Sequence, residues 1–354
     1  MLDTDRVLTL TLEPVGACTL ACRYCYAHAT THLPPCAPDM FYDTLRESVE
    51  YAERIGVNKV DCLWLGGEPL LAGSAFFEAL ASFTSALSRS VRVRHFVQTN
   101  GLLLDAAYCR LFRDANIRVG VSLDGPQDIH DAFRVAHDGS PTHARVMEKI
   151  GLLREHETPF GCVAVCTRET LGREREVYEF FHSLGVGFRI NPVIPNGNGD
   201  DTAYRITPEE YGQSLVRLFD AWVAPADNFV NVSPLDIYLQ AVLKGTSAGC
   251  QHRGFCDTLG IKPNGDATVC GRFQQGILGN VKQGHAGDIL RACMPETTCV
   301  RAPHTECRAC ANWAVCHGGC PHNAVAFGAD AAAKDPFCSA YKQIFAHIRN
   351  ALHP

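Results

Sequence analysis

The stretch Gly16–His28, GACTLACRYCYAH, brings three cysteines close together and guides the interpretation of the rest of the chain. Cys18, Cys22 and Cys25 form the spacing Cx3Cx2C. Three thiolates at this spacing can wrap one face of a cubane iron–sulfur cluster and leave one iron open for another ligand. A structural zinc site normally has four protein ligands, so the spacing favours an iron–sulfur cluster over zinc.

The composition sets wider limits on class and location. The chain has 354 residues, 46% hydrophobic and 20% charged, which is ordinary for a globular protein. A net charge of −6 without a basic run argues against a nucleic-acid partner. We expect a cytoplasmic protein without membrane contact, because neither a signal peptide nor an apolar run of about 20 residues is present. In that compartment, 18 cysteines indicate metal ligation or redox chemistry.

Short β-rich runs alternate with helical patterns over residues 1–200. We expect strands at Val7–Pro14, Val60–Leu65, Val91–Gln98, Ile117–Leu123, Phe160–Cys166 and Gly187–Pro192. We expect helices near Tyr42–Ile55, Ala75–Ser88, Ala106–Ala115, Ala144–Glu155 and Glu174–Leu184. This alternation predicts an α/β fold with a parallel sheet. Six such units are too few for a closed eight-stranded barrel, so we expect a partial (β/α)6 barrel of the TIM type.

Three domains are expected along the chain. Residues 1–200 form the barrel, and the stretch Pro195–Asp201 predicts a boundary loop. Residues 201–245 form a bridging segment, in which Thr207 and Pro208 predict the start of a helix. In residues 246–354 the apolar periodicity fades and Cys, Gly, Pro and His become dense, apart from a hairpin signal at Pro263–Asp266. We expect metal to hold this last region together.

The Cx3Cx2C motif, with Tyr24 just before its last cysteine, resembles the signature of radical S-adenosylmethionine (AdoMet, or SAM) enzymes. Further matches end predicted strands: Gly66–Gly67–Glu68–Pro69, Asn100 within QTNG, and Ser122 and Asp124 within SLDGP. The resemblance implies that the three cysteines hold a catalytic cluster whose open iron binds AdoMet. Cleavage of AdoMet by one electron then gives a 5′-deoxyadenosyl radical.

The resemblance also assigns cofactor contacts. It implies that the Gly66–Pro69 motif receives the methionine ammonium and that Ser122 contacts AdoMet. It implies that Arg134, in HDAFR, pairs with the AdoMet carboxylate, while Asp124 faces AdoMet or the substrate. Arg189 and Asn191 share a face of the sixth predicted strand, so we expect them to line the cavity and count Arg189 among the cofactor-binding residues.

Eight more cysteines follow a regular order in the last hundred residues or so, and this order closely resembles the SPASM domain of radical AdoMet enzymes. The resemblance implies two closed [4Fe–4S] clusters, for three in the whole chain. The first auxiliary cluster is assigned Cys250, Cys256, Cys270 and Cys320. The second auxiliary cluster is assigned Cys307, Cys310, Cys316 and Cys338.

The surrounding sequence is closest to the anaerobic sulfatase-maturase-like branch. Those enzymes carry an Asp after the third auxiliary cysteine, as a base for the substrate, where this chain has Gly271. Our main interpretation is therefore a maturase that crosslinks side chains of a ribosomal precursor peptide. The alternatives are a sulfatase maturase that forms formylglycine from Cys or Ser, a peptide epimerase, and an iron–sulfur carrier that is not an enzyme. Expected partners are the peptide and an electron donor such as flavodoxin or ferredoxin. The precursor is expected to be recognised either by the body of this protein or by a separate leader-peptide-binding protein.

Seven cysteines lie outside these motifs, and most are expected to be buried thiols. Cys162 and Cys166 lie four apart on one predicted strand and therefore share a face. If that face lines the barrel, either thiol can donate a hydrogen atom to a substrate radical, as an epimerase requires. Packing is the default interpretation of both.

Overall fold

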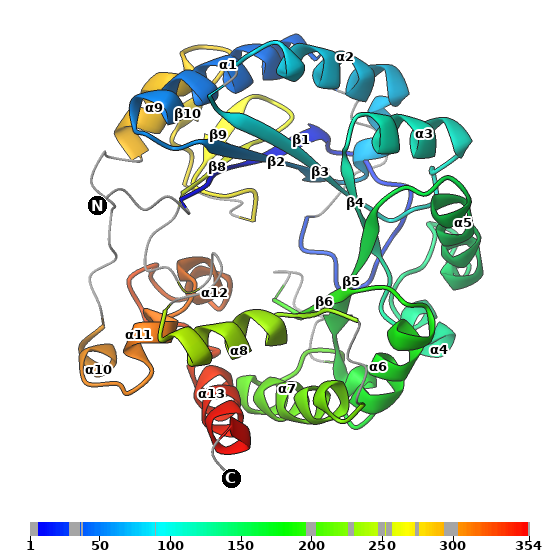
Figure 1. Ribbon diagram of the computed structural model, residues 1–354, viewed down its shortest axis with the longest axis vertical. Coiled ribbons are helices and arrows are strands. Elements are labelled where there is room, and N and C mark those ends of the chain that lie inside the picture. Colours follow the sequence, from blue (N-terminus) through cyan, green and yellow to red (C-terminus); the bar gives the residue numbers. More distant parts are fainter. Residues whose placement is uncertain are drawn as a thin grey trace.

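The fold is given by a computed structural model, which describes residues 6–27, 36, 38–88, 90–195, 203–225, 230–246, 252, 257–272, 276–293 and 304–352. One ten-stranded sheet curves through the molecule in the order β10-β9-β8-β1-β2-β3-β4-β5-β6-β7 (Figure 1). Its strands are β1 Leu8–Val15, β2 Lys59–Gly66, β3 Arg92–Thr99, β4 Arg118–Ser122, β5 Phe160–Cys166, β6 Phe188–Pro192, β7 Val232–Ser233, β8 Thr258–Ile261, β9 Asp266–Thr268 and β10 Gly279–Asn280.

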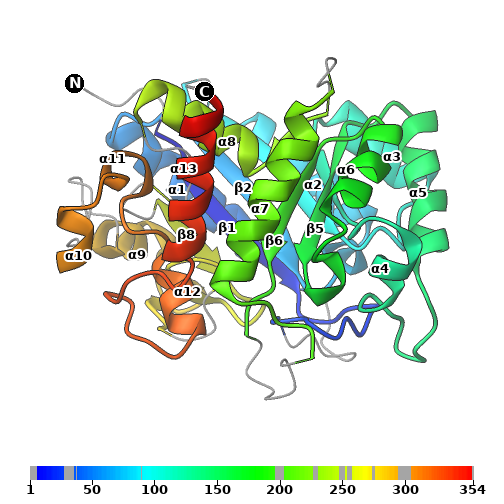
Figure 2. The same cartoon turned by 90° about the horizontal axis from the view of Figure 1, so that it is seen from below.

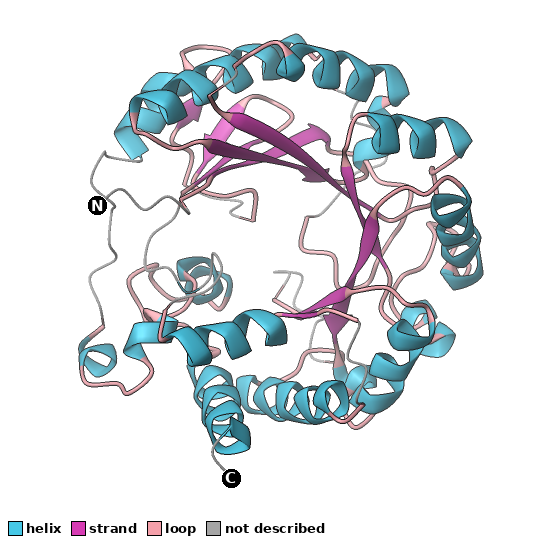
Figure 3. Ribbon diagram, viewed as in Figure 1, coloured by secondary structure: helices cyan, strands magenta, loops and turns pink. Residues whose placement is uncertain are grey.

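The strands from β8 through β1 to β7 run parallel, and β9 pairs antiparallel with both of its neighbours, β8 and β10. The helices lie outside the arc of strands, so the fold is the expected α/β partial barrel (Figure 3). All six predicted strands are confirmed, with ends that differ by at most one residue. The sheet also continues beyond them, through β7 at one end and β8 at the other.

The helices that follow the strands form the outer layer of the barrel. They are α1 Asp39–Arg54, α2 Ser74–Ser85, α3 Ala106–Asp114, α4 Gln127–Asp131, α5 His143–Glu155 and α6 Glu174–Ser183, with short 3-10 turns at Pro69–Ala72 and Arg168–Thr170. The five helices predicted in this part are confirmed, and α4 is an addition. None of the helices within the described ranges is long and apolar enough to cross a membrane.

Alternation along β1 separates the outer layer from the interior. Leu10 and Leu12 are fully buried in the core under the outer helices. Thr11 and Glu13 point to the opposite face, as the period of two in a strand requires. Polar side chains of β1 therefore face the inside of the barrel.

Two helices follow the barrel strands, α7 Pro208–Val223 and α8 Leu235–Lys244. Thr207 caps α7 as expected: its hydroxyl accepts a hydrogen bond from Glu210 N at 3.1 Å, and the Glu210 carboxylate accepts one from Thr207 N at 2.7 Å. The described stretch that holds β6 ends at Pro195, so the expected boundary loop Pro195–Asp201 lies almost entirely outside the described residues.

The C-terminal region is more regular than the sequence suggested. It contains α9 Ala286–Cys293, α10 Thr305–Arg308, α11 Trp313–Cys316, α12 Pro321–Ala326 and α13 Cys338–Leu352. The expected fading of periodicity is wrong for α13, which buries Ala340, Ile344, Phe345 and Ile348 and lies beside α7 (Figure 2). The predicted hairpin is confirmed: β8 and β9 pair antiparallel, and Gly265 takes the positive φ of 92° that its turn requires.

Candidate functional site

The predicted motifs meet at one edge of the sheet. The cysteine loop follows β1, the GGEP motif begins with Gly66 at the end of β2, and Asn100 follows β3. Ser122 ends β4, the next strand of the same parallel sheet. The carboxyl ends of parallel strands are where α/β proteins assemble their active sites, so this edge is the candidate active site.

The GGEP motif is packed directly on the cysteine loop. Gly67 N donates to Val15 O at 3.1 Å, and Glu68 N donates to Ala17 O at 2.8 Å. A Cβ atom added at Gly67 would lie 2.0 Å from Ala17 O, so any side chain at this position would clash with the backbone. The second glycine is therefore required by the close approach of two backbones, whatever its contact with a cofactor.

Glu68 is fully buried and organises the neighbouring strand end. Its carboxylate accepts hydrogen bonds from Thr99 Oγ1 at 2.7 Å, from Asn100 N at 2.8 Å and from Leu70 N at 3.1 Å. Burial raises the pKa of Glu68 to about 7, against the effect of these donors. A contact between this carboxylate and AdoMet stays a prediction, whereas its role in positioning β3 follows from the bonds.

The cysteine loop has hydrogen-bond donors for its thiolates, and these buried thiolates need a positive charge that an iron–sulfur cluster can supply. Asn100 Nδ2 lies 3.7 Å from Cys18 Sγ, and Leu20 N donates to the same sulfur at 3.4 Å. Burial raises the pKa of Cys22 to about 12, so its thiolate needs a compensating cation. A bound cluster supplies that charge and stabilises deprotonated cysteines. The three residues Cys18, Cys22 and Cys25 therefore fit a cluster.

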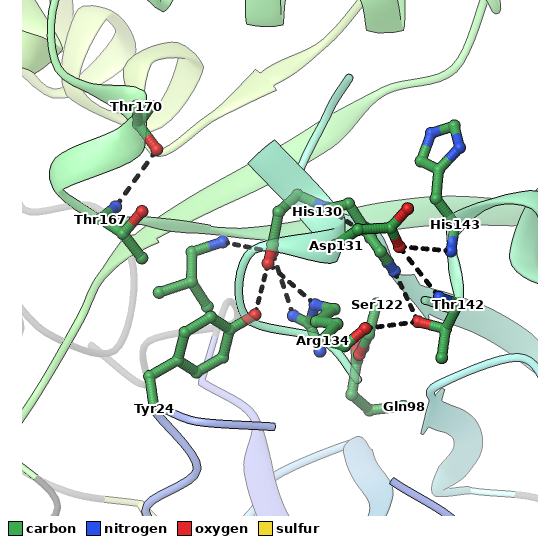
Figure 4. Close-up of polar contacts among 12 residues, drawn as sticks. Tyr24, Gln98, Ser122, His130, Asp131, Arg134, Thr142, His143, Thr167 and Thr170 are labelled. Atoms are coloured by element: carbon green, nitrogen blue, oxygen red, sulfur yellow. Dashed lines mark hydrogen bonds and ion pairs between the residues drawn. The ribbon is translucent and has the colours of Figure 1, made fainter. Parts of the chain in front are cut away.

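Tyr24, Asp124 and Arg134 form a buried network beneath the loop (Figure 4). The Tyr24 hydroxyl donates to Asp124 Oδ2 at 2.5 Å, and Arg134 Nε and Nη2 donate to the two Asp124 oxygens at 3.0 and 3.1 Å. The Arg134 guanidinium also lies 5.3 Å from the centre of the Tyr24 ring. Arg134 and Asp124 thus engage each other, and their contacts with AdoMet stay predictions.

A second layer supports Arg134 and was missed from the sequence. Thr142 Oγ1 donates to Arg134 O at 2.7 Å and lies 3.0 Å from His130 Nε2 (Figure 4). Asp131 Oδ1 accepts hydrogen bonds from the backbone of Thr142 and His143, each at 2.9 Å. His130 and Asp131 precede Arg134 in the HDAFR motif, so that motif was the signal that could have revealed them.

Other predicted residues are placed as follows. Ser122 Oγ accepts a hydrogen bond from Gln98 Nε2 at 2.9 Å, and Arg189 Nε donates to Asn191 Oδ1 at 2.9 Å. Cys162 and Cys166 are buried, and Cys166 Sγ lies 3.5 Å from Ser214 Oγ of the outer helix α7. Their face therefore packs against helices and does not line the barrel, which removes the condition for a hydrogen-atom donor.

Four C-terminal cysteines surround one small cavity. Cys307, Cys310, Cys316 and Cys338 line it together with Trp313, Lys334 and Tyr341. These are the four residues assigned to the second auxiliary cluster. Among the described residues, no three His, Cys, Asp or Glu side chains converge on a single metal ion. A cubane cluster spreads its thiolates over four irons, so these thiols fit a cluster better than one ion.

The first auxiliary site is only partly visible. Cys250 and Cys256 lie outside the described residues, and Cys270 and Cys320 are close enough for their charges to interact. Arg272 O lies 2.9 Å from His322 Nε2, so the two cysteine-bearing segments are adjacent. Every cysteine within the described ranges whose side chain is placed is a free thiol. The assignment of these ligands stays a prediction.

Comparisons with known proteins agree with this arrangement of the site. Residues 12–181 match the family model of the Radical SAM superfamily. This chain carries a radical SAM domain. As a radical SAM enzyme it uses AdoMet and a [4Fe–4S] cluster, and the cysteine loop, the GGEP motif and the Tyr24–Asp124–Arg134 network all lie within the matched residues.

The similarity extends beyond the radical SAM domain. The chain is 28% identical to the serine-type anaerobic sulfatase-maturating enzyme of Klebsiella aerogenes, over 97% of this chain and 85% of that protein. It is 26% identical to the cysteine-type anaerobic sulfatase-maturating enzyme of Clostridium perfringens, over 96% of this chain and 95% of that protein.

Two groups of solved structures share the fold. The first is anSMEcpe with bound AdoMet and Cp18Cys peptide, with a TM-score of 0.85, 23% identity and coverage of 98% of both chains. The second is Streptococcus suis SuiB bound to the precursor peptide SuiA, with a TM-score of 0.63, 16% identity and coverage of 90% of this chain and 72% of that one.

Proposed function

We propose that this radical SAM enzyme oxidises a Ser or Cys side chain of a peptide or protein substrate to formylglycine. The main support is the similarity of this chain to enzymes named for sulfatase maturation. This similarity covers 96% or more of the chain and includes the C-terminal cysteine region. The sequence alone favours crosslinking, because Gly271 stands where sulfatase maturases carry an aspartate. That preference rests on one residue, whereas the relatives match 96% or more of the chain.

Crosslinking of a ribosomal precursor peptide is the second candidate, and Gly271 favours it. A Cβ added at Gly271 would lie 2.8 Å from Thr11 Oγ1 and 2.9 Å from Thr11 Cβ, so β1 leaves no room for the aspartate of sulfatase maturases. The reason for this glycine is thus packing against β1. An epimerase has less support, because Cys162 and Cys166 face the outer helices.

Different residues of the chain would hold the cluster and fix the loops around it. When bound, AdoMet and the cluster supply a deoxyadenosyl radical that removes a hydrogen atom from a side-chain carbon. Cys18, Cys22 and Cys25 would hold the cluster, and Asn100 and the backbone of Leu20 donate toward one of its thiolates. Glu68 and the Asp124–Arg134 pair fix the surrounding loops. These buried contacts keep the reactive centre in one geometry.

The test uses the anaerobically reconstituted full chain with AdoMet and a chemical reductant. Three substrates are compared: a synthetic peptide with Cys in a sulfatase motif, its Ser counterpart, and any short precursor peptide encoded beside the gene. Formylglycine is detected as an aldehyde that a hydrazine reagent captures. A crosslink instead appears as the loss of two hydrogens without a captured aldehyde. Aldehyde in neither sulfatase peptide, with a crosslink in the precursor, would promote the second candidate.

We also propose that the chain holds three clusters, with Cys250, Cys256, Cys270 and Cys320 on one auxiliary cluster and Cys307, Cys310, Cys316 and Cys338 on the other. The cavity shared by the second set supports this. Iron analysis should then give about twelve irons per chain, four for each [4Fe–4S] cluster. A plateau near four irons would contradict the two auxiliary sites.

The remaining partners are proposals of the same kind. A flavodoxin or ferredoxin is expected to supply the electron, and a separate leader-binding protein is expected only if the substrate is a precursor peptide. A cytoplasmic location is consistent with the many free thiols.

A further inference from the structure

A buried ion pair joins the first strand of the barrel to the C-terminal region. Strands β1 and β8 pair in parallel with Leu12 opposite Ile261, so the next residues, Glu13 and Lys262, are neighbours. Lys262 Nζ donates to Glu13 Oε1 at 2.5 Å, and only 12% of the Glu13 side chain and 14% of the Lys262 side chain are exposed. The mechanism described above gives this pair no role.

The pair lies beside the GGEP motif. A Cβ added at Gly66, the first residue of GGEP, would lie 3.2 Å from Glu13 Cβ and 3.3 Å from Glu13 Cγ. Electrostatic interactions join Tyr26 to Glu13, to Cys25 of the catalytic cluster motif and to Cys270. The Glu13 carboxylate therefore lies beside Gly66, and Tyr26 of the cysteine loop is within electrostatic range of both Glu13 and Cys270.

The same pair also reaches Gly271. Lys262 Nζ donates to Gly271 O at 2.9 Å, and Gly271 N donates to Thr11 Oγ1 at 2.6 Å. The Gly271 peptide is thus bound to Thr11, which lies on the same inner face of β1 as Glu13. The position where sulfatase maturases carry their aspartate is separated from the Glu13 carboxylate by one lysine ammonium.

We infer that Glu13 is the proton acceptor of the oxidation and supplies the carboxylate that Gly271 lacks. The inference rests on the proposed function, which requires a base inside the barrel. Lys262 holds Oε1, and Oε2 has no hydrogen-bond partner among the residues that the structure describes. Burial raises the pKa of Glu13, and Lys262 opposes this effect without cancelling it, so the carboxylate is a stronger base than an exposed one.

The step balances with one proton at Glu13. The substrate Cys or Ser would lose a hydrogen atom from its side-chain carbon to the deoxyadenosyl radical and one electron to an oxidised [4Fe–4S] cluster held by the auxiliary cysteines proposed above. Its S–H or O–H proton passes to Glu13 Oε2 as the C=S or C=O double bond forms. Water then replaces sulfur in the Cys case, with release of hydrogen sulfide. The protonated Glu13 remains beside the Lys262 ammonium and returns its proton to solvent.

The test is Glu13→Gln, which keeps the size of the side chain and an acceptor for Lys262 but cannot take the proton. The probe is the synthetic Cys peptide, and the measured quantity is aldehyde formed per 5′-deoxyadenosine. We expect this ratio to fall about 100-fold or more, the usual worth of a general base. Asp61→Asn is the matched control: it removes an inner-face carboxylate from the Arg94 pair on β2 and β3, and the ratio should not change.

Four results decide whether Glu13 is the proton acceptor. An unchanged ratio in Glu13→Gln would overturn it. Loss of deoxyadenosine formation in both Glu13→Gln and Glu13→Asp would also overturn it, because the pair would then be needed for the fold or for AdoMet. Recovery of at least a tenth of the ratio in Glu13→Asp, which keeps a carboxylate, supports it. If the unmodified enzyme forms deoxyadenosine but no aldehyde from any peptide, the proposed function fails and the inference fails with it.

Discussion

Asp124→Asn removes the charge that balances Arg134 beneath the cysteine loop. The two side chains are 1% and 9% exposed, and both Arg134 donors bind the carboxylate. Removing one partner of such a buried pair costs about 3–5 kcal/mol, because the other charge stays buried without compensation. At roughly 2 °C per kcal/mol for a chain of this size, the Tm should fall by about 6–10 °C.

The assay is thermal unfolding of the cluster-free protein under anaerobic reducing conditions, followed by circular dichroism. Asp61→Asn is the matched control, because its bidentate partner Arg94 is 35% exposed and the pair should contribute only about 0–1 kcal/mol. Replacing both buried partners, Asp124→Leu with Arg134→Met, should recover most of the lost stability. Equal Tm values for the Asp124→Asn and Asp61→Asn variants would refute the reasoning.

Three further predictions follow from contacts described above. Gly271→Asp should cost about 1–3 kcal/mol, since its Cβ would lie 2.8 Å from Thr11 Oγ1, and should not raise aldehyde formation; denaturant unfolding and the peptide assay check this. Cys320→Ala should make the chain beyond residue 245 sensitive to limited proteolysis after reconstitution, and an unchanged digest would contradict it. Burial raises the pKa of Glu68 from 4.5 to about 7, so between these pH values the folded state keeps a proton that the unfolded state loses. The free energy of unfolding of the unmodified protein, relative to Glu68→Gln, should therefore fall as pH rises through this range and level off above it. Urea unfolding at several pH values measures this.

Much of the barrel was predictable because each strand is short, buried and followed by an amphipathic helix. The strand Phe160–Cys166 was predicted with its observed ends. The partnership of β8 with β1 was not predictable, since Thr258–Ile261 is only four residues long and its neighbour in the sheet lies about 250 positions earlier. The helix Cys338–Leu352 was predictable, because its apolar residues recur at helical spacing, although it lies in a region dense in cysteines.

In the candidate site, the positions of the motifs were predictable and the side-chain partners were not. The motifs located the strand ends, and the structure brings Asn100 to Cys18 as their order implied. Side-chain partners depend on tertiary packing. The family resemblance assigned Arg134 to the AdoMet carboxylate and Asp124 to AdoMet or the substrate, so it did not predict that the two residues pair with each other. The carboxylate of Glu13 was missed for a related reason: its partner Lys262 is about 250 residues away, and no motif contains either residue.

The parallel pairing of β8 with β1 bears on how the chain is synthesised. Until residue 261 leaves the ribosome, β1 has an unpaired edge next to the cysteine loop. Unpaired edges of hydrophobic strands recruit other chains, and pairings between distant residues form slowly. A nascent barrel without β8 is therefore the aggregation-prone stage of folding, and a chaperone or early cluster insertion would act most usefully in that interval. The hairpin of β8 and β9 serves as the cap that ends this exposure.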